Sequence, residues 1–535
     1  MTVTRILVEN IIIPHEIGRS GAESDAMALS SAKKKIRRAF GCGCIGAVIN
    51  KKSVDARKKS AVKLVYSVCA DVKIDSRIVT EKSLKDFKLY TEAEFKFNKG
   101  TKKLHGRPVI AGFGPAGIFC ALALAENGYS PIVYERGGCV ADRVAAVEKF
   151  TLTGELDTST NIQFGAGGAG TFSDGKLTTR IGDPLCAYVL SKLVELGAPE
   201  DVATKAKPHI GTDILRNVVE NADLRVKELG GDVRYNSQVK LKGERISVNG
   251  GDQDYGVLVL AVGHSARDTY EELLAEGYAV EPKAFSVGVR IEHLQSELDS
   301  AMLGDFAGDP TIGHAEYNIS YRSGDRGVYS FCMCPGGEVV GAASEECGVV
   351  TNGMSHRRRD GMNANAAIAV SVKPEDYGAT PVGAISFQRE LEKRAFNIGG
   401  KTYAAPVQTV GDFLEGKSGT LPSRILPTYR NGDVTPVDLH DILPPFVSGM
   451  LEEGLRSFGR KISVFNCEDA PMTGVETRTS APLRIMRGEK YTAFTRDRVY
   501  PCGEGAGYAG GIMSAAIDGL KVARAIMEEY APIEG

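Results

Sequence analysis

The chain has 535 residues, of which 43% are hydrophobic and 25% are charged, and its net charge is −2. This length exceeds what one hydrophobic core normally serves, so we expect two to four domains. No apolar run approaches the roughly 18 residues of a membrane-spanning helix. The first residues resemble neither a signal nor a transit peptide, so the expected location is the cytoplasm.

The first hundred residues predict a small basic α/β module. Residues 1–104 carry 22 Lys and Arg against 11 Asp and Glu, which leaves the remainder acidic. Ile6–Ile13 and Val62–Val72 predict strands, and Asp25–Phe40 predicts a basic amphipathic helix. Two interpretations stay open: the basic surface binds nucleic acid, or it is a solvated face that packs on the acidic remainder. The lysine-rich segment Phe95–His105 predicts a linker.

The rest of the chain predicts a doubly wound domain that is interrupted by a second domain. Residues 105–284 alternate short β runs with helices, the pattern of a doubly wound α/β sheet. Residues 285–482 mix β runs and helical stretches, and we expect an inserted α+β domain there. Residues 483–535 return to strand, glycine turn and helix, and should complete the first domain.

A dinucleotide-binding pattern opens the doubly wound domain. Pro108–Ala111 predicts a strand, and the following residues match G-x-G-x-x-G and begin a helix with an apolar face: Gly112, Phe113, Gly114, Pro115, Ala116 and Gly117. A second strand, Pro131–Tyr134, ends on Glu135, where the pattern requires an acid. Strand, helix and acid are therefore all in register.

Each part of this pattern has a physical task. Gly112 allows the tight turn, Gly114 lets the backbone approach a pyrophosphate, and Gly117 permits close packing of helix on strand. The helix N-terminus attracts the phosphates, and Glu135 can accept hydrogen bonds from ribose hydroxyls.

A second match to the glycine pattern, Gly165–Gly170, lacks this context. Polar residues 157–163 precede it, and Thr171–Lys176 cannot open an apolar-faced helix. We expect a loop whose Gly167 and Gly168 lie over the pyrophosphate, ribityl chain or ring of a single bound dinucleotide. The chain should therefore contain one dinucleotide-binding unit, not two.

The C-terminal segment predicts another strand, glycine turn and helix, with the helix running to about Tyr530. Glu504 follows Gly503 at a position where a carboxylate can hold ribose or ribityl hydroxyls. Gly510 and Gly511, followed by Ile512, let the helix start approach a ring, whose negative charge the helix N-terminus would stabilise.

Three motifs together resemble the glutathione-reductase-type FAD fold: the first glycine pattern with Glu135, the strand end Leu258–His264, and Gly503-Glu504 before the last helix. The resemblance implies one tightly bound FAD, with Gly263 lying along it. It also implies that the strand Val233–Lys240 covers the adenine, with the backbone contact at Gln238 and Val239.

A closer match is to a family of uncharacterised bacterial FAD-dependent dehydrogenases, within the NAD(P)/FAD-dependent oxidoreductases. It rests on long strings at residues 161–177, 207–213, 331–337 and 507–512. The match implies a flavoprotein that transfers hydride through flavin N5 to or from an unidentified small organic substrate. NAD(P)H is a candidate transient electron donor without a Rossmann site of its own.

The sequence is less informative about catalysis. The segment after Glu135 holds a single cysteine, so a disulfide reductase of the glutathione-reductase type is not expected, and Arg136 and Arg143 are candidates to meet the cofactor's phosphates or adenosine. Strand 329–334 resembles the substrate-domain strand that faces the ring in flavoproteins of the geranylgeranyl-reductase type. Alternation places Cys332 and Cys334 on one face, and Cys334 is the candidate catalytic thiol, with a buried core pair as the alternative.

Lys176 is a candidate for a flavin phosphate or an anionic substrate, or else a solvated loop lysine. The run Arg357–Arg359 is a candidate anion site, although such runs are usually exposed. The 11 cysteines include no C-x-x-C pair, and no histidine pair has metal-ligand spacing, so we expect reduced thiols and no metal.

Two other functions stay open. One is a flavoenzyme that acts on tRNA through the basic module, although that module has no RNA-binding signature. The other is a non-catalytic FAD-fold binding protein, which the intact motifs at both cofactor ends disfavour.

Overall fold

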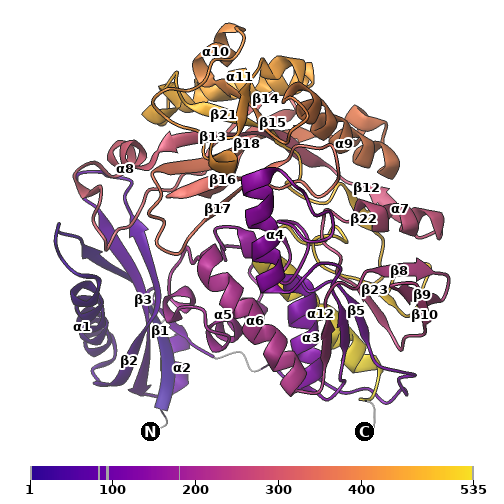
Figure 1. Ribbon diagram of the computed structural model, residues 1–535. Coiled ribbons are helices and arrows are strands. Elements are labelled where there is room, and N and C mark those ends of the chain that lie inside the picture. The colour runs from indigo at the N-terminus through magenta and orange to yellow at the C-terminus, as the bar shows by residue number, and fades with distance from the viewer. Residues whose placement is uncertain (1–2, 82–84, 92–94, 180, 533–535) are drawn as a thin grey trace. The chain divides into compact units, whose positions relative to one another are not determined.

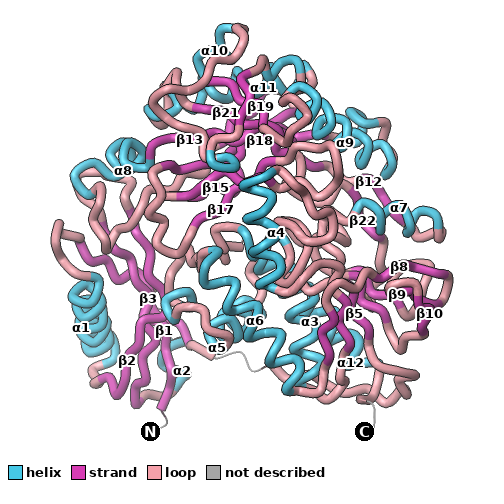
Figure 2. Tube along the Cα trace, viewed as in Figure 1, coloured by secondary structure: helices cyan, strands magenta, loops and turns pink. Residues whose placement is uncertain are grey.

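The computed structural model describes residues 3–81, 85–91, 95–179 and 181–532. The chain forms two compact units, each assembled from three separate segments. Unit 1 comprises Met1–Phe95, Gly182–His209 and Gln295–Ala315, and unit 2 comprises Lys96–Ile181, Ile210–Leu294 and Glu316–Gly535. Figures 1 and 2 show the helices and strands of both units.

Unit 1 contains a four-stranded antiparallel sheet in the order β2-β3-β1-β4, with helix α1 packed on it (Figure 1). The strands are β1 (Val3–Pro14), β2 (Cys44–Asp55), β3 (Lys63–Lys73) and β4 (Phe87–Leu89). The helices are α1 (Gly21–Phe40), α2 (Ser76–Glu81), α5 (Leu185–Glu195) and α8 (Gln295–Leu303). The predicted α/β module is thus present, and its two expected strands and its helix are confirmed.

Local sequence explains why α1 forms where it does. Ser20 and Glu23 make a reciprocal capping box at its start, and Gly41 ends it in a left-handed conformation. Ala28, Ala32 and Ile36, four residues apart, form the buried stripe that faces the sheet.

Unit 2 begins with a parallel five-stranded sheet in the order β23-β11-β5-β6-β7. Its strands are β5 (Val109–Ala111), β6 (Ile132–Tyr134), β7 (Asp232–Arg234), β11 (Leu258–Leu260) and β23 (Val499–Pro501). The associated helices are α3 (Pro115–Glu126), α4 (Val140–Thr153), α6 (Thr212–Glu228), α7 (Arg267–Ala275) and α12 (Ile512–Glu529). The last strand of the chain, β23, follows the inserted residues and completes this sheet beside β11. The predicted doubly wound fold is therefore confirmed.

Helices α3 and α12 lie side by side against this sheet (Figure 1). Their approach is very close, because a Cβ added to Gly519 would lie 2.2 Å from the carbonyl oxygen of Ala116. This contact joins the first turn of α3 to the middle of α12.

The inserted part of unit 2 contains a mixed seven-stranded sheet in the order β14-β15-β18-β13-β21-β19-β20. Its strands are β13 (Phe285–Leu294), β14 (Ser320–Ser323), β15 (Arg326–Cys334), β18 (Asn363–Val372), β19 (Ala405–Thr409), β20 (Val434–Pro436) and β21 (Pro471–Glu476). Two small sheets flank it, made of β12 (Val280–Pro282) with β22 (Leu483–Ile485) and of β16 (Gly337–Gly341) with β17 (Thr351–Ser355). The helices are α9 (Pro381–Ile398), α10 (Val410–Glu415) and α11 (Pro445–Gly459), and α11 covers β14, β15 and β18 (Figure 1).

The strand expected at Val233–Lys240 is wrong as a single element. It divides into β7 of the parallel sheet and β8 (Val239–Lys242) of a separate antiparallel sheet with β9 (Arg245–Val248) and β10 (Gly251–Gln253). Asn236 causes the break, because its φ of 51° is left-handed and its backbone N–H donates to Gly137 instead of continuing a ladder.

The segment expected to be a linker, Phe95–His105, is partly docked. The N–H of Gly100 donates to the carbonyl of Met527 at 2.7 Å, and Lys102 pairs with Glu529 at 2.7 Å. The two compact units also differ from the domains that the sequence predicts. Unit 1 includes two later segments, and unit 2 includes both the doubly wound and the inserted parts. No helix among the described residues is long and apolar enough to cross a bilayer.

Candidate functional site

The first glycine turn joins β5 to α3 and needs glycine at two positions. Gly112 has a φ of 104°, and a Cβ there would lie 2.4 Å from the carbonyl oxygen of Ala261. A Cβ on Gly117 would lie 2.0 Å from the carbonyl oxygen of Gly112. Gly114 is the N-cap of α3 and provides no side chain to cap it. The start of α3 therefore offers free backbone N–H groups, as a pyrophosphate site requires.

Glu135, directly after β6, ties the two glycine runs together. One carboxylate oxygen accepts from the N–H of Phe113 at 2.8 Å, and the other accepts from the N–H groups of Gly137 and Gly165 at 3.0 Å each. The buried carboxylate thus orders both loops. Its expected contact with a ribose stays a prediction.

The second glycine run lies between the starts of α3 and α12. A Cβ added to Gly168 would lie 3.0 Å from Cα of Gly114, and one added to Gly170 would lie 3.1 Å from Cγ1 of Ile512. No strand precedes the run, and only a short 3₁₀ helix, Ala169–Phe172, follows it. It is therefore not a second Rossmann unit. It borders the first one, as expected for a loop over the same dinucleotide.

Arg143 has a role different from the expected cofactor contact. Its side chain is fully buried, and its three guanidinium nitrogens donate to four loop carbonyls, those of Asn161, Ile162, Ala166 and Gly168, at 2.6–2.8 Å. Burial lowers the pKa of this guanidinium to about 9. Arg143 therefore holds the second glycine run in place, and its expected contact with the cofactor stays a prediction.

Arg136 and Gln238 meet at one carboxylate near the end of β6. Arg136 pairs with Asp268 at 3.0 Å, and Nε2 of Gln238 donates to the same carboxylate at 2.6 Å. The Arg136 guanidinium also lies over the ring of Phe164, 4.3 Å from its centroid. Val239 is buried and begins β8. Contact between these residues and an adenine stays a prediction.

The strand end at Gly263 and the C-terminal turn come together. Gly263 has a φ of 79°, and a Cβ there would meet nothing within 4 Å. A Cβ on Gly505 would lie 2.4 Å from the carbonyl oxygen of Gly263. The turn is anchored from α12, where Asp518 accepts from the N–H of Gly503 at 2.7 Å and pairs with Arg487 at 2.6 Å.

The start of α12 is open. Gly511, its N-cap, provides no side-chain cap, and a Cβ on Gly510 or Gly511 would meet nothing within 4 Å. Free N–H groups and a positive dipole end thus border open space, which suits the electron-rich edge of a flat ring. With the uncapped start of α3, the described residues fit an FAD: one helix end for its pyrophosphate and one for its ring.

Glu504 is the titratable group of this turn. The pKa of its carboxyl is raised to about 7: burial raises it, Lys283 partly opposes this effect, and Cys332 adds a smaller increase. Burial lowers the pKa of Lys283, and Glu504 counteracts that effect. Three side chains from three segments are therefore coupled electrostatically. Lys283 was missed from the sequence, because nothing near it in the chain marks it as functional.

The cysteine strand departs from regular alternation. The pairing register of β15 with β18 shifts between Phe331 and Cys334, and Cys332 adopts a left-handed φ of 44°. Cys334 is completely buried, whereas Cys332 is partly exposed. Contact between Cys334 and a ring stays a prediction. Cys332 is the more exposed of the two residues, and its bulge could not be read from the sequence.

Charged side chains surround this bulge. Arg290 on β13 is fully buried, pairs with Glu476 at 3.0 Å and donates to the carbonyl of Cys332 at 3.2 Å. Lys176 pairs with Asp174 at 2.6 Å. Burial depresses the pKa of Lys176, but Asp174 and Glu316 more than compensate, so it stays above its ordinary value.

Lys176 is therefore paired with a carboxylate, and its contact with a flavin phosphate or an anionic substrate stays a prediction. Arg359, expected to be exposed, is buried and pairs with the same Asp174 at 2.6 Å. The described part of the chain contains no group of three or more His, Cys, Asp or Glu side chains that could hold a metal ion.

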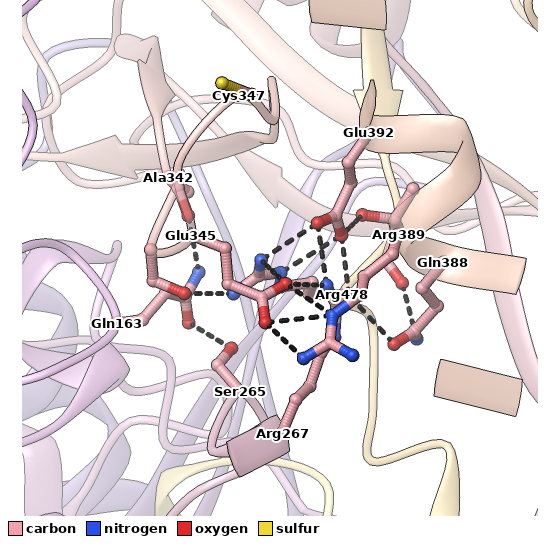
Figure 3. A network of polar contacts seen from close by, with 12 residues as sticks. Gln163, Ser265, Arg267, Ala342, Glu345, Cys347, Gln388, Arg389, Glu392 and Arg478 are labelled. Atoms are coloured by element: carbon pink, nitrogen blue, oxygen red, sulfur yellow. Dashed lines mark hydrogen bonds and ion pairs between the residues drawn. The ribbon is translucent and has the colours of Figure 1, made fainter. Parts of the chain in front are cut away.

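A second buried network joins the parallel-sheet part to the inserted part of unit 2 (Figure 3). Arg267 on α7 and Arg478, just after β21, point at Glu392 on α9, at 2.7 and 2.9 Å. Glu345 pairs with Arg267 at 2.6 Å and with Arg389 at 2.7 Å. Burial alone would raise the pKa of Glu392, but the two arginines hold it well below its ordinary value.

Comparison with known proteins gives the family. A family model described as "FAD-dependent protein, C-terminal domain-like" matches residues 284–479. An uncharacterized protein of Clostridium beijerinckii is 47% identical over 492 residues, covering 90% of this chain and 92% of that protein.

Two solved flavoprotein structures show partial likeness. CtdE in complex with FAD has 13% identity and a TM-score of 0.31, with 79% of this chain and 84% of that chain covered. A flavoprotein/dehydrogenase from Cytophaga hutchinsonii has 11% identity and a TM-score of 0.36, with 79% and 78% covered. The identity to the Clostridium protein along nearly the whole length, together with the match to the family model, shows that this chain belongs to a family of bacterial FAD-dependent flavoproteins.

Proposed function

We propose that this protein is an FAD-dependent oxidoreductase, a dehydrogenase or reductase, that transfers hydride to or from a small organic substrate. The observation that carries the proposal is the coupling of Glu504, Lys283 and Cys332 beside the open start of α12. A carboxyl whose pKa is about 7 is suited to exchange protons at neutral pH. A protein that only stored FAD would have no use for such a group.

The chain's residues would divide the work between the two helix starts. The N–H groups at the start of α3 bind the pyrophosphate, and Gly114 leaves room for it. The start of α12, with Gly510 and Gly511, receives the ring, and the second glycine run keeps water away from the cofactor. The flavin, when bound, supplies hydride transfer at N5. Glu504 holds or releases a proton at a carboxylate oxygen.

The proposal also includes an electron donor, a class of substrate and a location. NAD(P)H would act as a transient donor, since the described residues contain a single strand–glycine–helix unit with an acid after its second strand. The substrate is a small molecule, and the location is the cytoplasm. Gln238, Val239, Arg136 and Gly263 would line the adenosine half and the middle of the cofactor.

The test is anaerobic reduction of the purified full-length protein. Denaturation should release FAD and not FMN. NADH, then NADPH, then a panel of reduced metabolites are added in turn, and loss of the visible flavin band is followed. We expect at least one donor to bleach the flavin and an organic acceptor to restore it.

Two results would overturn the proposal. Protein that takes up no FAD would remove the cofactor assignment. An FAD that dithionite reduces, but that none of the organic donors or acceptors affects, would favour a non-catalytic binding protein.

A further inference from the structure

We propose that Cys332 and Cys334 form a redox-active dithiol that exchanges two electrons with the bound flavin. The proposal rests on the proposed function in one respect, since it needs the flavin ring to lie at the Glu504 turn. It differs in kind from the disulfide-reductase arrangement of the glutathione-reductase type, because the pair lies on a strand of the inserted sheet and not after the first strand–helix–strand unit.

The strand geometry brings the two thiols together. In a regular strand, residues i and i+2 are separated by about 6.6 Å of rise, too far for the 3.5–4.5 Å between Cβ atoms that a disulfide requires. In β15 the register shift and the left-handed Cys332 break this spacing. Sγ of Cys334 donates to the carbonyl oxygen of Cys332 at 3.3 Å, and the Cys334 side chain is the largest influence that lowers the pKa of the Cys332 thiol.

Buried side chains hold the bulge in one conformation. Arg290 donates to the carbonyl of Cys332 at 3.2 Å while its other nitrogens bind Glu476 at 3.0 Å and Asn365 at 2.6 Å. A non-glycine residue in a left-handed conformation persists only where its surroundings enforce it, and such positions concentrate at functional sites.

Charges from several elements make the two thiols unequal. The Cys334 thiol, Arg290 on β13 and Lys176 of the glycine-run segment lower the pKa of Cys332 to about 6, while burial and Glu476 on β21 oppose them. The pKa of Cys334 is raised by the Cys332 sulfur, by burial and by Asp174, with Arg290 opposing. Cys332 is therefore a thiolate at neutral pH, and Cys334 keeps its proton.

Cys332 also lies within electrostatic range of the Glu504 turn. The residue is partly exposed, and its charge raises the pKa of Glu504. A thiolate beside a flavin and a protonated partner behind it are the two parts of a dithiol centre.

The electron balance is simple. Oxidation of the pair forms a bond between Sγ of Cys332 and Sγ of Cys334 and releases the Cys334 proton, any proton on Cys332 and two electrons, which reduce FAD to its two-electron form. In reverse, the reduced flavin returns two electrons, the S–S bond breaks, and Cys334 takes up its proton. The holoprotein therefore accepts four electrons per FAD instead of two.

The first test counts electrons in the air-oxidised holoprotein by anaerobic dithionite titration. We expect four electrons per FAD in the wild type and two in Cys332→Ser and in Cys334→Ser. Cys347→Ser is the matched control, since Cys347 is an exposed thiol of the same inserted region. It should accept four electrons. In the Cys347→Ser background, the tryptic peptide that contains both cysteines should carry an internal disulfide after oxidation and two free thiols after reduction.

The second test needs no flavin turnover. The reduced protein is alkylated with iodoacetamide at a series of pH values, and each cysteine is read by peptide mass spectrometry. Cys332 should react with a midpoint near pH 6, and Lys176→Met should move that midpoint upward. The alkylation of Cys347, the exposed control thiol, should not respond to Lys176→Met.

The outcomes separate this inference from the proposed function. Two electrons per FAD in the wild type, or a Cys332 alkylation midpoint that Lys176→Met does not move, would overturn the dithiol. Four electrons per FAD in a protein that no organic donor reduces would support the dithiol and reject the proposed function. Reduction by an organic donor with only two electrons would do the reverse.

Discussion

At the residue scale, Gly114 differs from the other glycines of its turn in a way that can be tested. Its φ is −82°, and a Cβ there would make an ordinary contact of 3.7 Å with Gly168. Gly114→Ala should therefore fold normally but place a methyl group where a pyrophosphate approaches α3. We expect FAD affinity to fall at least about tenfold, or about 1.4 kcal/mol, with the unfolding of the apoprotein unchanged.

Flavin titration and thermal unfolding of the apoprotein measure the two quantities. Gly449→Ala is the control, because a Cβ there would meet nothing within 4 Å and Gly449 lies on α11, in the inserted part of unit 2. It should retain wild-type FAD affinity. Unchanged affinity in Gly114→Ala would mean that the start of α3 does not hold the pyrophosphate.

Glu504 predicts a pH dependence with a definite sign. Its pKa rises from 4.5 to about 7 on folding, so folding favours its neutral form. The contribution to stability is complete below pH 4.5 and is lost as the pH rises through 7, by at most about 3 kcal/mol. Glu504→Gln stays neutral, so between pH 5 and pH 8 its apoprotein should lose less stability than the wild type.

Urea unfolding at several pH values checks this expectation. Glu244→Gln, a change at an exposed glutamate, serves as the control and should follow the wild type. Parallel stability curves for the wild type and Glu504→Gln would contradict the buried, raised carboxyl.

Residue roles differed in how far the sequence could predict them. Gly112 and Gly117 were predictable, because their tasks depend on backbone contacts within one short pattern. Arg143 and Lys176 were not, because the groups that satisfy them are loop carbonyls and a carboxylate that only the folded chain presents. The role of Cys332 could not be predicted for a third reason. A bulge depends on the neighbouring strand, and the alternation of residues in the sequence does not indicate it.

At the element scale, the buried network of Figure 3 should contribute strongly to stability. Glu392 on α9 compensates two buried arginines, so Glu392→Gln would leave positive charge without its partner. Removing one partner of a buried ion pair typically costs about 3–5 kcal/mol. We expect a loss of that size in urea unfolding.

The same helix supplies the control. Glu390 is exposed and pairs with Arg394 one turn away, and such surface pairs contribute about 0.5 kcal/mol or less. Glu390→Gln should therefore leave stability nearly unchanged. Equal losses in the two variants would show that the network is not the link between the two parts of unit 2.

The second glycine run gives another prediction for a whole element. Gly168 has a φ of 63° and lies against Gly114, so Gly168→Val would strain the loop and push it into the first glycine turn. We expect weaker FAD binding or a shifted flavin spectrum, without a loss specific to NADH or NADPH. Gly243→Val is matched in φ, at 59°, but lies in a hairpin turn with open space around it. It should keep the wild-type spectrum, and a matching change there would attribute the effect to backbone strain alone.

Elements were predictable from the sequence where burial is one-sided or complete. β13 places apolar side chains at alternate positions from Phe285 to Ile291, and α1 carries a regular buried stripe with caps at both ends. β2 was missed because none of its residues is fully buried, so its sequence has no hydrophobic alternation. The periodicity of hydrophobic residues reflects burial, so the sequence of an exposed strand shows little periodicity.

At the scale of the whole molecule, chain order was a poor guide to the units. Unit 1 includes two later segments, Gly182–His209 and Gln295–Ala315. His15 contacts Asp309 at 2.9 Å in its buried interior, and the N–H of Lys52 donates to the carbonyl of Thr204 at 2.8 Å. A sequence divides naturally into consecutive domains, whereas burial depends on which segments meet in space. The basic charge of residues 1–104 could be counted from the sequence, but its function could not be predicted from it.

The last prediction concerns that charge. On α1 four exposed basic residues could meet a polyanion, and they are Lys33, Lys34, Arg37 and Arg38. Four phosphate contacts give a salt slope of about −3.6, so affinity should fall about fiftyfold between about 50 and 150 mM salt. We therefore expect tRNA to bind the full-length protein at low salt only, and reversal of all four charges to abolish that binding without changing FAD content or flavin reduction. Reversal of Lys393 and Arg394, exposed on α9, is the control and should leave low-salt binding intact. Electrophoretic mobility shifts across a salt series measure the outcome, and tRNA retained at 150 mM salt by the wild type but not by the four-charge variant would make tRNA a partner of this flavoprotein.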